Sequence, residues 1–184
     1  MTRRLVLGLI TTSSVVFSTM PALAVQAELI PALEQSYLQK AGERHQAEVA
    51  LGQLALQKAS GDQVKQYGAR MIQDHQQMIE RVEKLIRKEG ELSMPHQQIQ
   101  RKLAELSGKD FDKAYMAFMV RDHMKNLSEL EQRAPTLTDA RVEHWTADTL
   151  RILKDHLAHA KVIAATIGVD AEDEPKVQQD STSQ

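Results

Sequence analysis

The chain has 184 residues, a formal net charge of −2 and no cysteine. The length suits one domain with short flanking segments, and the absence of cysteine excludes disulfides, iron–sulfur clusters, thiol catalysis and cysteine-based zinc sites. Charges of both signs are interspersed, so the charge pattern gives no reason to expect nucleic acid as a partner. Aromatic residues make up only 4% of the chain, which disfavours a strand-rich fold.

Residues 1–24 are typical of a secretory signal peptide. Arg3 and Arg4 supply the positive start, residues 5–17 a short apolar core, and the Ala-Leu-Ala run at 22–24 a cleavage site. The apolar core is too short for a transmembrane helix, and no later segment approaches the roughly 20 apolar residues of a span. The paired arginines leave twin-arginine export open beside the general secretory route. We therefore expect a protein of the periplasm or cell envelope with no transmembrane segment.

Glycine, proline and capping residues divide the rest of the chain into helical segments. Apolar residues at helical spacing predict long helices over 35–59, 63–89, 109–133 and 139–167, and a short helix over 97–106. Thr138 is expected to cap the last long helix, and Gly168 to end it. The acidic and polar segment 169–184 is expected to be a disordered tail.

Long amphipathic helices joined by short connections are typical of a helical bundle. The sequence predicts an all-α fold, an up-down four-helix bundle over 33–167, with one longer connection between the second and third long helices. Small residues on the first helix, among them Gly52, predict a close approach to a neighbouring helix. We expect a monomer or a weak dimer.

Each long helix carries a histidine near the middle of its apolar face: His45, His75, His123 and His156. Because mid-helix residues of an antiparallel bundle share one layer, we expect the imidazoles to lie within about 10 Å of one another. Glu48, one turn after His45, brings a carboxylate to the same layer. The sequence therefore predicts a site for one transition-metal ion, Zn²⁺, Cu²⁺ or Fe²⁺. Its ligands would be Glu48, His75, His123 and His156, with His45 as a further candidate.

The same histidines have an alternative interpretation, a buried polar network without metal, because core imidazoles commonly hydrogen-bond to nearby carboxylates and carbonyls. Asp74, Asp122 and Asp155 each precede a histidine and would either orient neighbouring imidazoles or face solvent. His96 and His159 are expected at the surface.

Several motifs resemble those of a known family. They are the runs at 48–55 (EVALGQLA), 64–75 (VKQYGARMIQDH), 108–115 (GKDFDKAY) with His123, and 153–157 (LKDHL). The family is an exported ferritin-like bundle family, catalogued as a domain of unknown function and often labelled as outer-membrane proteins. The resemblance covers about 33–167 and implies the bundle fold and an envelope location, but no activity. His45 is not part of the matched pattern.

Di-iron ferritins need a Glu-x-x-His motif on each of two helices, and no Glu or Asp in this chain is followed three residues later by His. We therefore expect no ferroxidase chemistry, and we predict no catalytic residue. Three functions stay open. The first is metal storage, buffering or stress response without catalysis. The second is a metal-free structural, interaction or stress protein with an unknown protein partner. The third is a mononuclear metal hydrolase-type enzyme.

Overall fold

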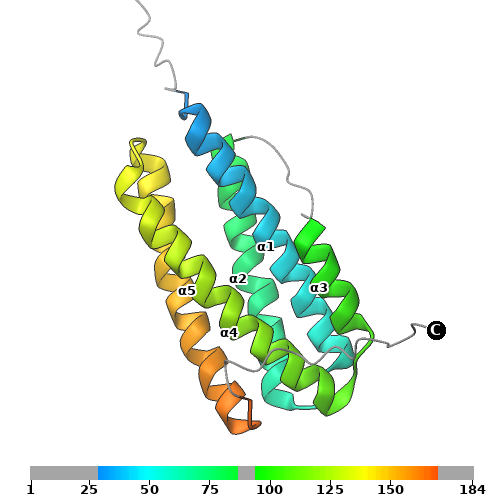
Figure 1. Ribbon diagram of the computed structural model, residues 1–184. Helices are drawn as coiled ribbons and strands as arrows, with labels where there is room; N and C mark the ends of the chain where they lie inside the picture. The colour runs from blue at the N-terminus through cyan, green and yellow to red at the C-terminus, as the bar shows by residue number, and fades with distance from the viewer. Residues whose placement is uncertain (1–28, 87–93, 170–184) are drawn as a thin grey trace, which may run out of the picture.

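The computed structural model describes residues 29–86 and 94–169, except the side chains of 94–96. Its helices are α1 (Ala32–Lys58), α2 (Asp62–Ile86), α3 (Met94–Ala104), α4 (Gly108–Arg133) and α5 (Ala140–Thr166), with a short 3-10 helix at Ala134–Thr136 (Figure 1). The predicted all-α class is confirmed for this part of the chain, in which no strand occurs. The predicted signal peptide, 1–24, and the end of the predicted helix 63–89 lie outside the described residues.

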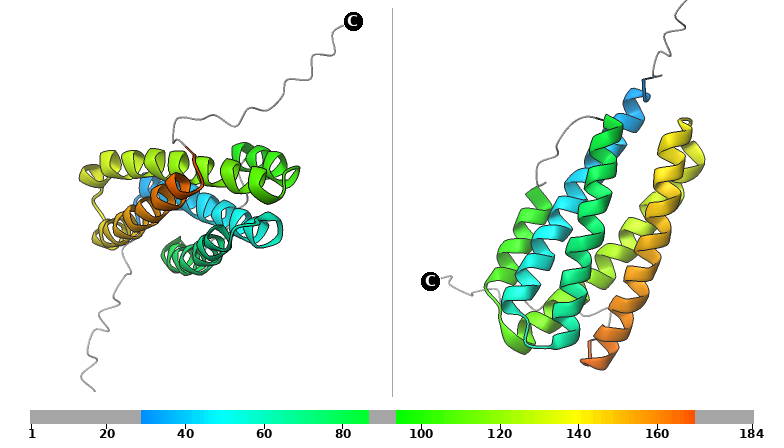
Figure 2. Two further views of the ribbon diagram at one scale, coloured as in Figure 1. Left: turned by 90° about the horizontal axis from the view of Figure 1, so that it is seen from below. Right: turned by 180° about the vertical axis from the view of Figure 1, so that it is seen from behind.

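The four long helices lie side by side, and the shorter α3 lies against α1 (Figures 1 and 2). α1 and α2 form one antiparallel pair, and α4 and α5 form a second. α2 and α4 run in the same direction, because α3 returns the chain to the end where α2 begins. Gly108, the first residue of α4, accordingly bridges to Ala59, just before α2. The structure differs from the predicted up-down order at the longer connection, across which the second and third long helices are parallel.

Gly52 of α1 and Gly68 of α2 face each other where these helices pack together. A Cβ atom on Gly52 would lie 2.7 Å from the carbonyl oxygen of Gly68, and one on Gly68 would lie 2.7 Å from the Cβ of Ala55. Only glycine leaves room for so close a contact. The predicted close approach of the first helix is confirmed. The contact lies two turns from His45 and from His75, so it constrains the helix spacing at those histidines.

Two buried carboxylates join the helix pairs at opposite ends of the molecule. Asp112, in the first turns of α4, accepts hydrogen bonds from the Ser60 N–H (3.1 Å), the Ser60 hydroxyl (2.7 Å) and the Gly61 N–H (2.9 Å). Glu34, at the start of α1, accepts from the Thr138 N–H (2.8 Å), the Thr138 hydroxyl (2.7 Å) and the next N–H along (3.2 Å). Each inter-helix turn is thus held by a carboxylate of the other helix pair. We call these two contacts the carboxylate clamps.

The ends of α5 differ slightly from the prediction. Asp139 is the N-cap, and its side chain accepts a hydrogen bond from the N–H two residues further on at 2.9 Å. Thr138 was the wrong choice because its hydroxyl belongs to a carboxylate clamp. Gly168 ends the helix as predicted, with a φ of 70° that favours glycine. Val169, the first residue of the predicted tail, packs against the core, and 170–184 lie outside the described residues.

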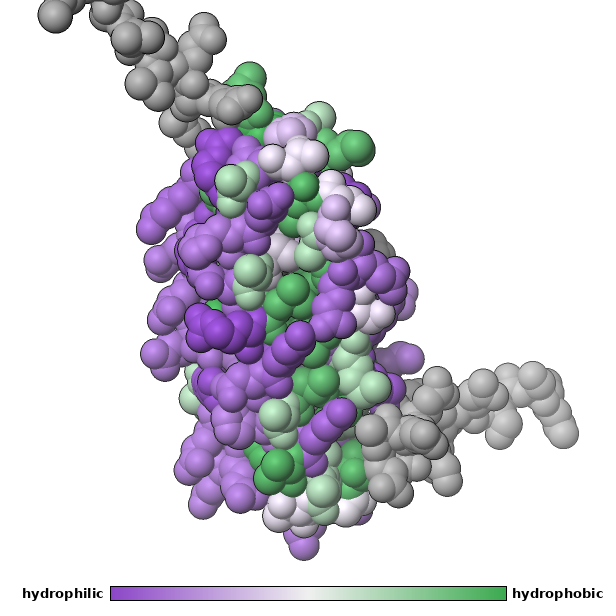
Figure 3. All heavy atoms as spheres, turned by 90° about the vertical axis from the view of Figure 1, so that its left-hand side faces the viewer, coloured by the Kyte–Doolittle hydropathy of each residue, from purple (hydrophilic) through white to green (hydrophobic). Residues whose placement is uncertain are grey.

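The surface is mainly hydrophilic on the side shown in Figure 3, with a band of apolar residues between the charged ones. Single exposed apolar residues are normal on such a surface. Across residues 29–86 and 94–169, none of the helices has the combination of length and hydropathy that crossing a bilayer requires.

Candidate metal centre

Four imidazoles, one from each long helix, meet in the interior. His45 comes from α1, His75 from α2, His123 from α4 and His156 from α5, and each residue is at most 1% exposed. The ring centroid of His75 lies 5.0 Å from that of His45, 5.3 Å from that of His156 and 6.2 Å from that of His123. The centroids of His123 and His156 are 5.6 Å apart. The expected shared layer is confirmed. We call these four side chains the imidazole cluster.

Hydrogen bonds fix which nitrogen of His123 and His156 carries the proton. The Nδ1 atom of His123 lies 3.0 Å from the carbonyl oxygen of Met119, and because a carbonyl only accepts, Nδ1–H must donate. His156 donates from Nε2 to the Asp74 carboxylate at 2.7 Å, and Asp74 also accepts from Arg70 Nε at 3.2 Å. The opposite nitrogens, His123 Nε2 and His156 Nδ1, therefore keep their lone pairs. Both are buried and have no hydrogen-bond partner.

His75 has a free buried nitrogen as well. Its Nδ1 atom lies 3.0 Å from Nδ1 of His45, so one of these two nitrogens donates to the other, and its Nε2 atom has no partner. When His75 is the donor, its Nε2 keeps a lone pair. Independently of the tautomers, one ring nitrogen each of His75, His123 and His156 lies within 4.8 Å of the other two. Three imidazole nitrogens from three helices are thus gathered at one point.

Two carboxylates extend the cluster beside His123. Oxygen atoms of Glu48 and Asp122 and a nitrogen of His123 lie within 4.8 Å of one another. Glu48 is 1% exposed, and neither of its oxygens has a hydrogen-bond partner. Since buried carboxylates are normally hydrogen-bonded, this group lacks a partner of positive or hydrogen-donating character.

Burial lowers the pKa of each histidine of the imidazole cluster, which favours the neutral form. Burial lowers the pKa of His45 to about 3, helped by the charge of Arg44. Burial also lowers the pKa of His123 to about 4, with a contribution from His156. The pKa of His75 is held well below its usual value by burial and by the other imidazoles. Neutral imidazoles with buried lone pairs are the form in which histidine binds metal ions.

The pKa of Glu48 is shifted upward, whereas those of the histidines are shifted downward. Burial, and after it the nearby carboxylate of Asp122, raise the pKa of Glu48 well above its usual range. Burial and the negative charge of Glu48 also raise the pKa of Tyr67 and Tyr115. The interior around Glu48 therefore disfavours negative charge and would be relieved by a cation.

The predicted ligands lie close together, but in two overlapping groups. His75, His123 and His156 form one group, and Glu48 joins His123 in the other. His45 contacts the first group only through His75. Thus the nitrogens of three histidines could share one ion, whereas Glu48 approaches it from the side of His123.

The three aspartates that precede histidines were expected either to orient an imidazole or to face solvent, and the structure shows an example of each. Asp74 orients His156, whereas Asp155 is half exposed and pairs with Arg70. Asp122 lies beside Glu48, which the sequence did not indicate, because its position on α4 pointed away from the predicted ligand face. His159 is exposed as expected, and the side chain of His96 lies outside the described part of the chain.

Comparison with known proteins gives a family without a function. Residues 19–163 match the family model described as "Domain of unknown function (DUF4142)". No curated protein matches the chain, and no solved structure does. The chemistry must therefore be inferred from the site.

Proposed function

Since the chain belongs to the DUF4142 family, whose description assigns no activity, we propose from the site that it binds one transition-metal ion in the imidazole cluster. Two observations carry the proposal: His75, His123 and His156 bring one ring nitrogen each within 4.8 Å of the other two, and each of these rings has a buried nitrogen without a hydrogen-bond partner. A core that satisfied its imidazoles by hydrogen bonding alone would not leave all three without a partner.

The partners of the remaining nitrogens support the same proposal. Metal-bound histidines usually donate their second ring N–H to a carboxylate or a backbone carbonyl, which fixes the ring orientation and the tautomer. His156 does so to Asp74 and His123 to the Met119 carbonyl. The lone pairs are thus held in position before any ion arrives, which reduces the entropy cost of binding.

Glu48 is the proposed fourth ligand. Its carboxylate neighbours His123, has no hydrogen-bond partner and lies where a cation would offset the cost of burying negative charge. Three imidazoles and one carboxylate suit Zn²⁺, Cu²⁺ and Fe²⁺. The donor set contains no thiolate, so it has no special preference for the softest ions.

The role that fits a buried site of this kind is storage, buffering or stress response without catalysis. We propose a ferritin-like bundle, since four long helices with one crossing connection are found in such folds. We also propose export to the cell envelope, on the basis of the signal-like residues 1–24.

The test is the metal content and metal affinity of the protein purified without a polyhistidine tag. After exposure to Zn²⁺ or Cu²⁺ and dialysis, the wild-type protein should retain one ion per chain by elemental analysis. His123→Gln should weaken binding at least 100-fold, because a ligand is lost. Asp74→Asn should weaken it about 10- to 100-fold, because His156 loses its orienting carboxylate.

His159→Gln is the matched control, since it removes an exposed histidine one turn from His156. It should bind metal as the wild type does. Circular dichroism would verify that each variant is folded. If His123→Gln does not fold, Asp74→Asn still tests the site. A wild-type protein that retains no stoichiometric ion would favour the metal-free network instead. Equal affinities in Asp74→Asn and His159→Gln would show that the ion binds elsewhere than at His156, and would contradict the proposed site.

A further inference from the structure

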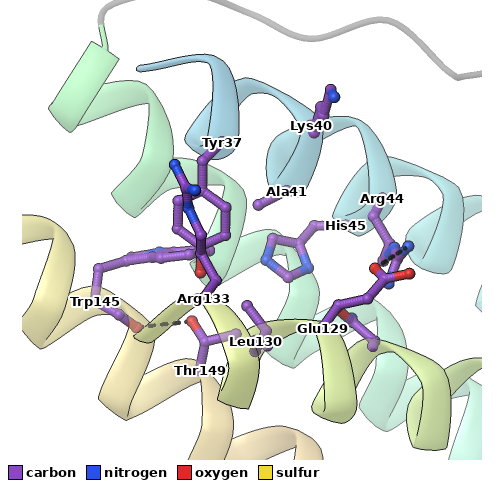
Figure 4. Close-up of a pocket in the computed structure, with 11 residues that line it drawn as sticks. Tyr37, Lys40, Ala41, Arg44, His45, Glu129, Leu130, Arg133, Trp145 and Thr149 are labelled. Atoms are coloured by element: carbon purple, nitrogen blue, oxygen red, sulfur yellow. Dashed lines mark hydrogen bonds and ion pairs between the residues drawn. The ribbon is translucent and has the colours of Figure 1, made fainter. Parts of the chain in front are cut away.

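A separate pocket of about 250 Å³ lies between α1, α4 and α5. Figure 4 shows Tyr37, Arg133 and Trp145 on one side of it, and Arg44 with Glu129 on the other. His45 also lines the pocket, with its ring at the inner wall. The sequence pattern predicts none of these residues except His45 as part of a site.

The walls of the pocket are partly aromatic and apolar. Tyr37 and Trp145 meet edge to face with ring centroids 5.9 Å apart, and Ala41 and Leu130 add aliphatic surface. An apolar cavity of about 150 Å³ is large enough for benzene. A pocket of 250 Å³ therefore has room for one ring with a small substituent.

The charged groups of the pocket are mainly positive. Lys40, Arg44 and Arg133 supply three cations, and Glu129 is the one carboxylate among the lining residues. Glu129 accepts from Nη2 of Arg44 at 3.1 Å and is half exposed. The guanidinium of Arg133 lies 5.8 Å from the centre of the Tyr37 ring. An anion in this pocket would be attracted, and a cation repelled.

Several lining residues also have buried donors without a partner. They are Nη1 of Arg44, Nε of Arg133 and Nε1 of Trp145, and each of these groups can only donate. The Trp145 residue is 2% exposed. His45 Nε2 is unpartnered too, and it carries a hydrogen whenever His75 Nδ1 donates to His45. Buried donors without acceptors are uncommon and require an explanation.

We propose that this pocket binds a small organic anion, a carboxylate attached to one planar or aromatic ring, of about the size of benzoate. The carboxylate accepts a hydrogen bond from Nε of Arg133, on the side of Tyr37 and Trp145, and is attracted by the charges of Arg44 and Lys40. The ring contacts Tyr37, Trp145 and Leu130. A bare inorganic anion would leave the aromatic walls uncovered, and a neutral ring would leave the arginine nitrogens unpaired.

Fluorescence of the protein offers a direct test, because Trp145 is the one tryptophan in the chain. Titration with benzoate should change its emission saturably. Benzamide, which has the same shape without charge, should bind about tenfold more weakly or worse, since charge-assisted hydrogen bonds are lost. Benzamidine and inorganic phosphate should give no saturable change.

Substitutions locate the binding. Arg133→Gln should weaken benzoate binding about tenfold, whereas Arg151→Gln, an exposed arginine of α5 outside the pocket, should leave it unchanged. Binding should persist in His123→Gln and in metal-free wild-type protein, because the pocket does not depend on an ion. Loss of binding in those two samples would instead indicate a carboxylate that ligates the metal, and would overturn the proposal.

Three other results would also overturn it. These are the absence of a saturable signal with benzoate, an equal affinity for benzamide, and an unchanged affinity in Arg133→Gln.

Discussion

Glu34 and Asp112 are buried at the two ends of the molecule, and Glu48 is buried at its centre, but their surroundings differ in kind. Each clamp carboxylate accepts three hydrogen bonds from the turn that it holds. Neither oxygen of Glu48 has such a partner. The clamps show that this fold can satisfy a buried carboxylate completely.

The comparison shows that the interior around Glu48, unlike the two clamps, contains buried polar groups that lower the stability of the fold. An unmatched buried polar group costs about 1–3 kcal/mol, and more if it is charged. The cluster around Glu48 contains several such atoms, among them nitrogens of His75, His123 and His156. Buried groups of this kind require an explanation, and the ion proposed above would supply the partners that they lack.

The largest expected difference between the imidazole cluster and the carboxylate clamps is in how the free energy of unfolding depends on pH. The folded pKa of His123, about 4, lies below the unfolded value of about 6.5. The unfolded chain therefore binds the proton first, and stability falls as pH drops from about 6.5 to about 4. Over that range His123 alone accounts for about 3 kcal/mol. Urea unfolding of metal-free protein at several pH values would measure this loss.

His123→Gln should remove that part of the loss, and the exposed control His159→Gln should keep it. If the stability of His123→Gln depended on pH as that of the wild type does, His123 would not be the source of the loss between about pH 6.5 and 4.

The carboxylate clamps contribute to the pH dependence of stability at lower pH. Burial raises the pKa of Glu34, but the hydrogen bonds from Thr138 and the following N–H outweigh it, so the net pKa is lowered. Its contribution is present above about pH 4.5 and is lost below that.

Loss of a clamp should have the next largest effect. Asp112→Ala removes an acceptor for three hydrogen bonds from Ser60 and Gly61, so we expect it to lower the free energy of unfolding by about 2 kcal/mol. Asp110→Ala removes an exposed aspartate from the same end of α4 and should cost less than about 1 kcal/mol. Urea unfolding at neutral pH is the measurement. Equal losses in the two variants would mean that the clamp adds nothing beyond a helix-end charge.

The smallest effect, and of opposite sign, is expected at Glu48. The raised pKa of Glu48 means that the unfolded chain ionises first, so its burial costs more as pH rises above about 4.5. In metal-free protein at neutral pH, Glu48→Gln should therefore leave stability unchanged or raise it by about 1 kcal/mol. Glu34→Gln, the same substitution in a clamp on the same helix, should lower it. A clear loss of stability in Glu48→Gln would show that Glu48 is satisfied after all.

The sequence predicted those features that follow from periodicity along one helix. The spacing of apolar residues gave the helices, and the position of His75, His123 and His156 on the apolar faces placed them in one layer. Gly52 indicated a close contact with a neighbouring helix, because a small residue on a buried face leaves room for one, but it did not indicate that the neighbour is α2.

Features that depend on the relative rotation and direction of helices were not predictable in this way. Asp122 lies beside Glu48 only because of how α4 is rotated against α1. The pocket lined by Arg44, Arg133 and Trp145 combines side chains from three helices with no shared motif. The reversal of direction at α3 could not be read from the sequence, since a long connection permits either orientation.

The clamps have a consequence for how the chain folds. The Glu34 and Thr138 groups that bond are 104 residues apart, and Ser60 and Asp112 are 52 residues apart. The acceptors for these particular hydrogen bonds thus come from the other helix pair, and neither half of the chain contains both partners. Such contacts of long sequence separation form late and slow the search for the native state. The first helix pair must therefore wait for the second before its turn is secured, and the two pairs fold as a single cooperative unit.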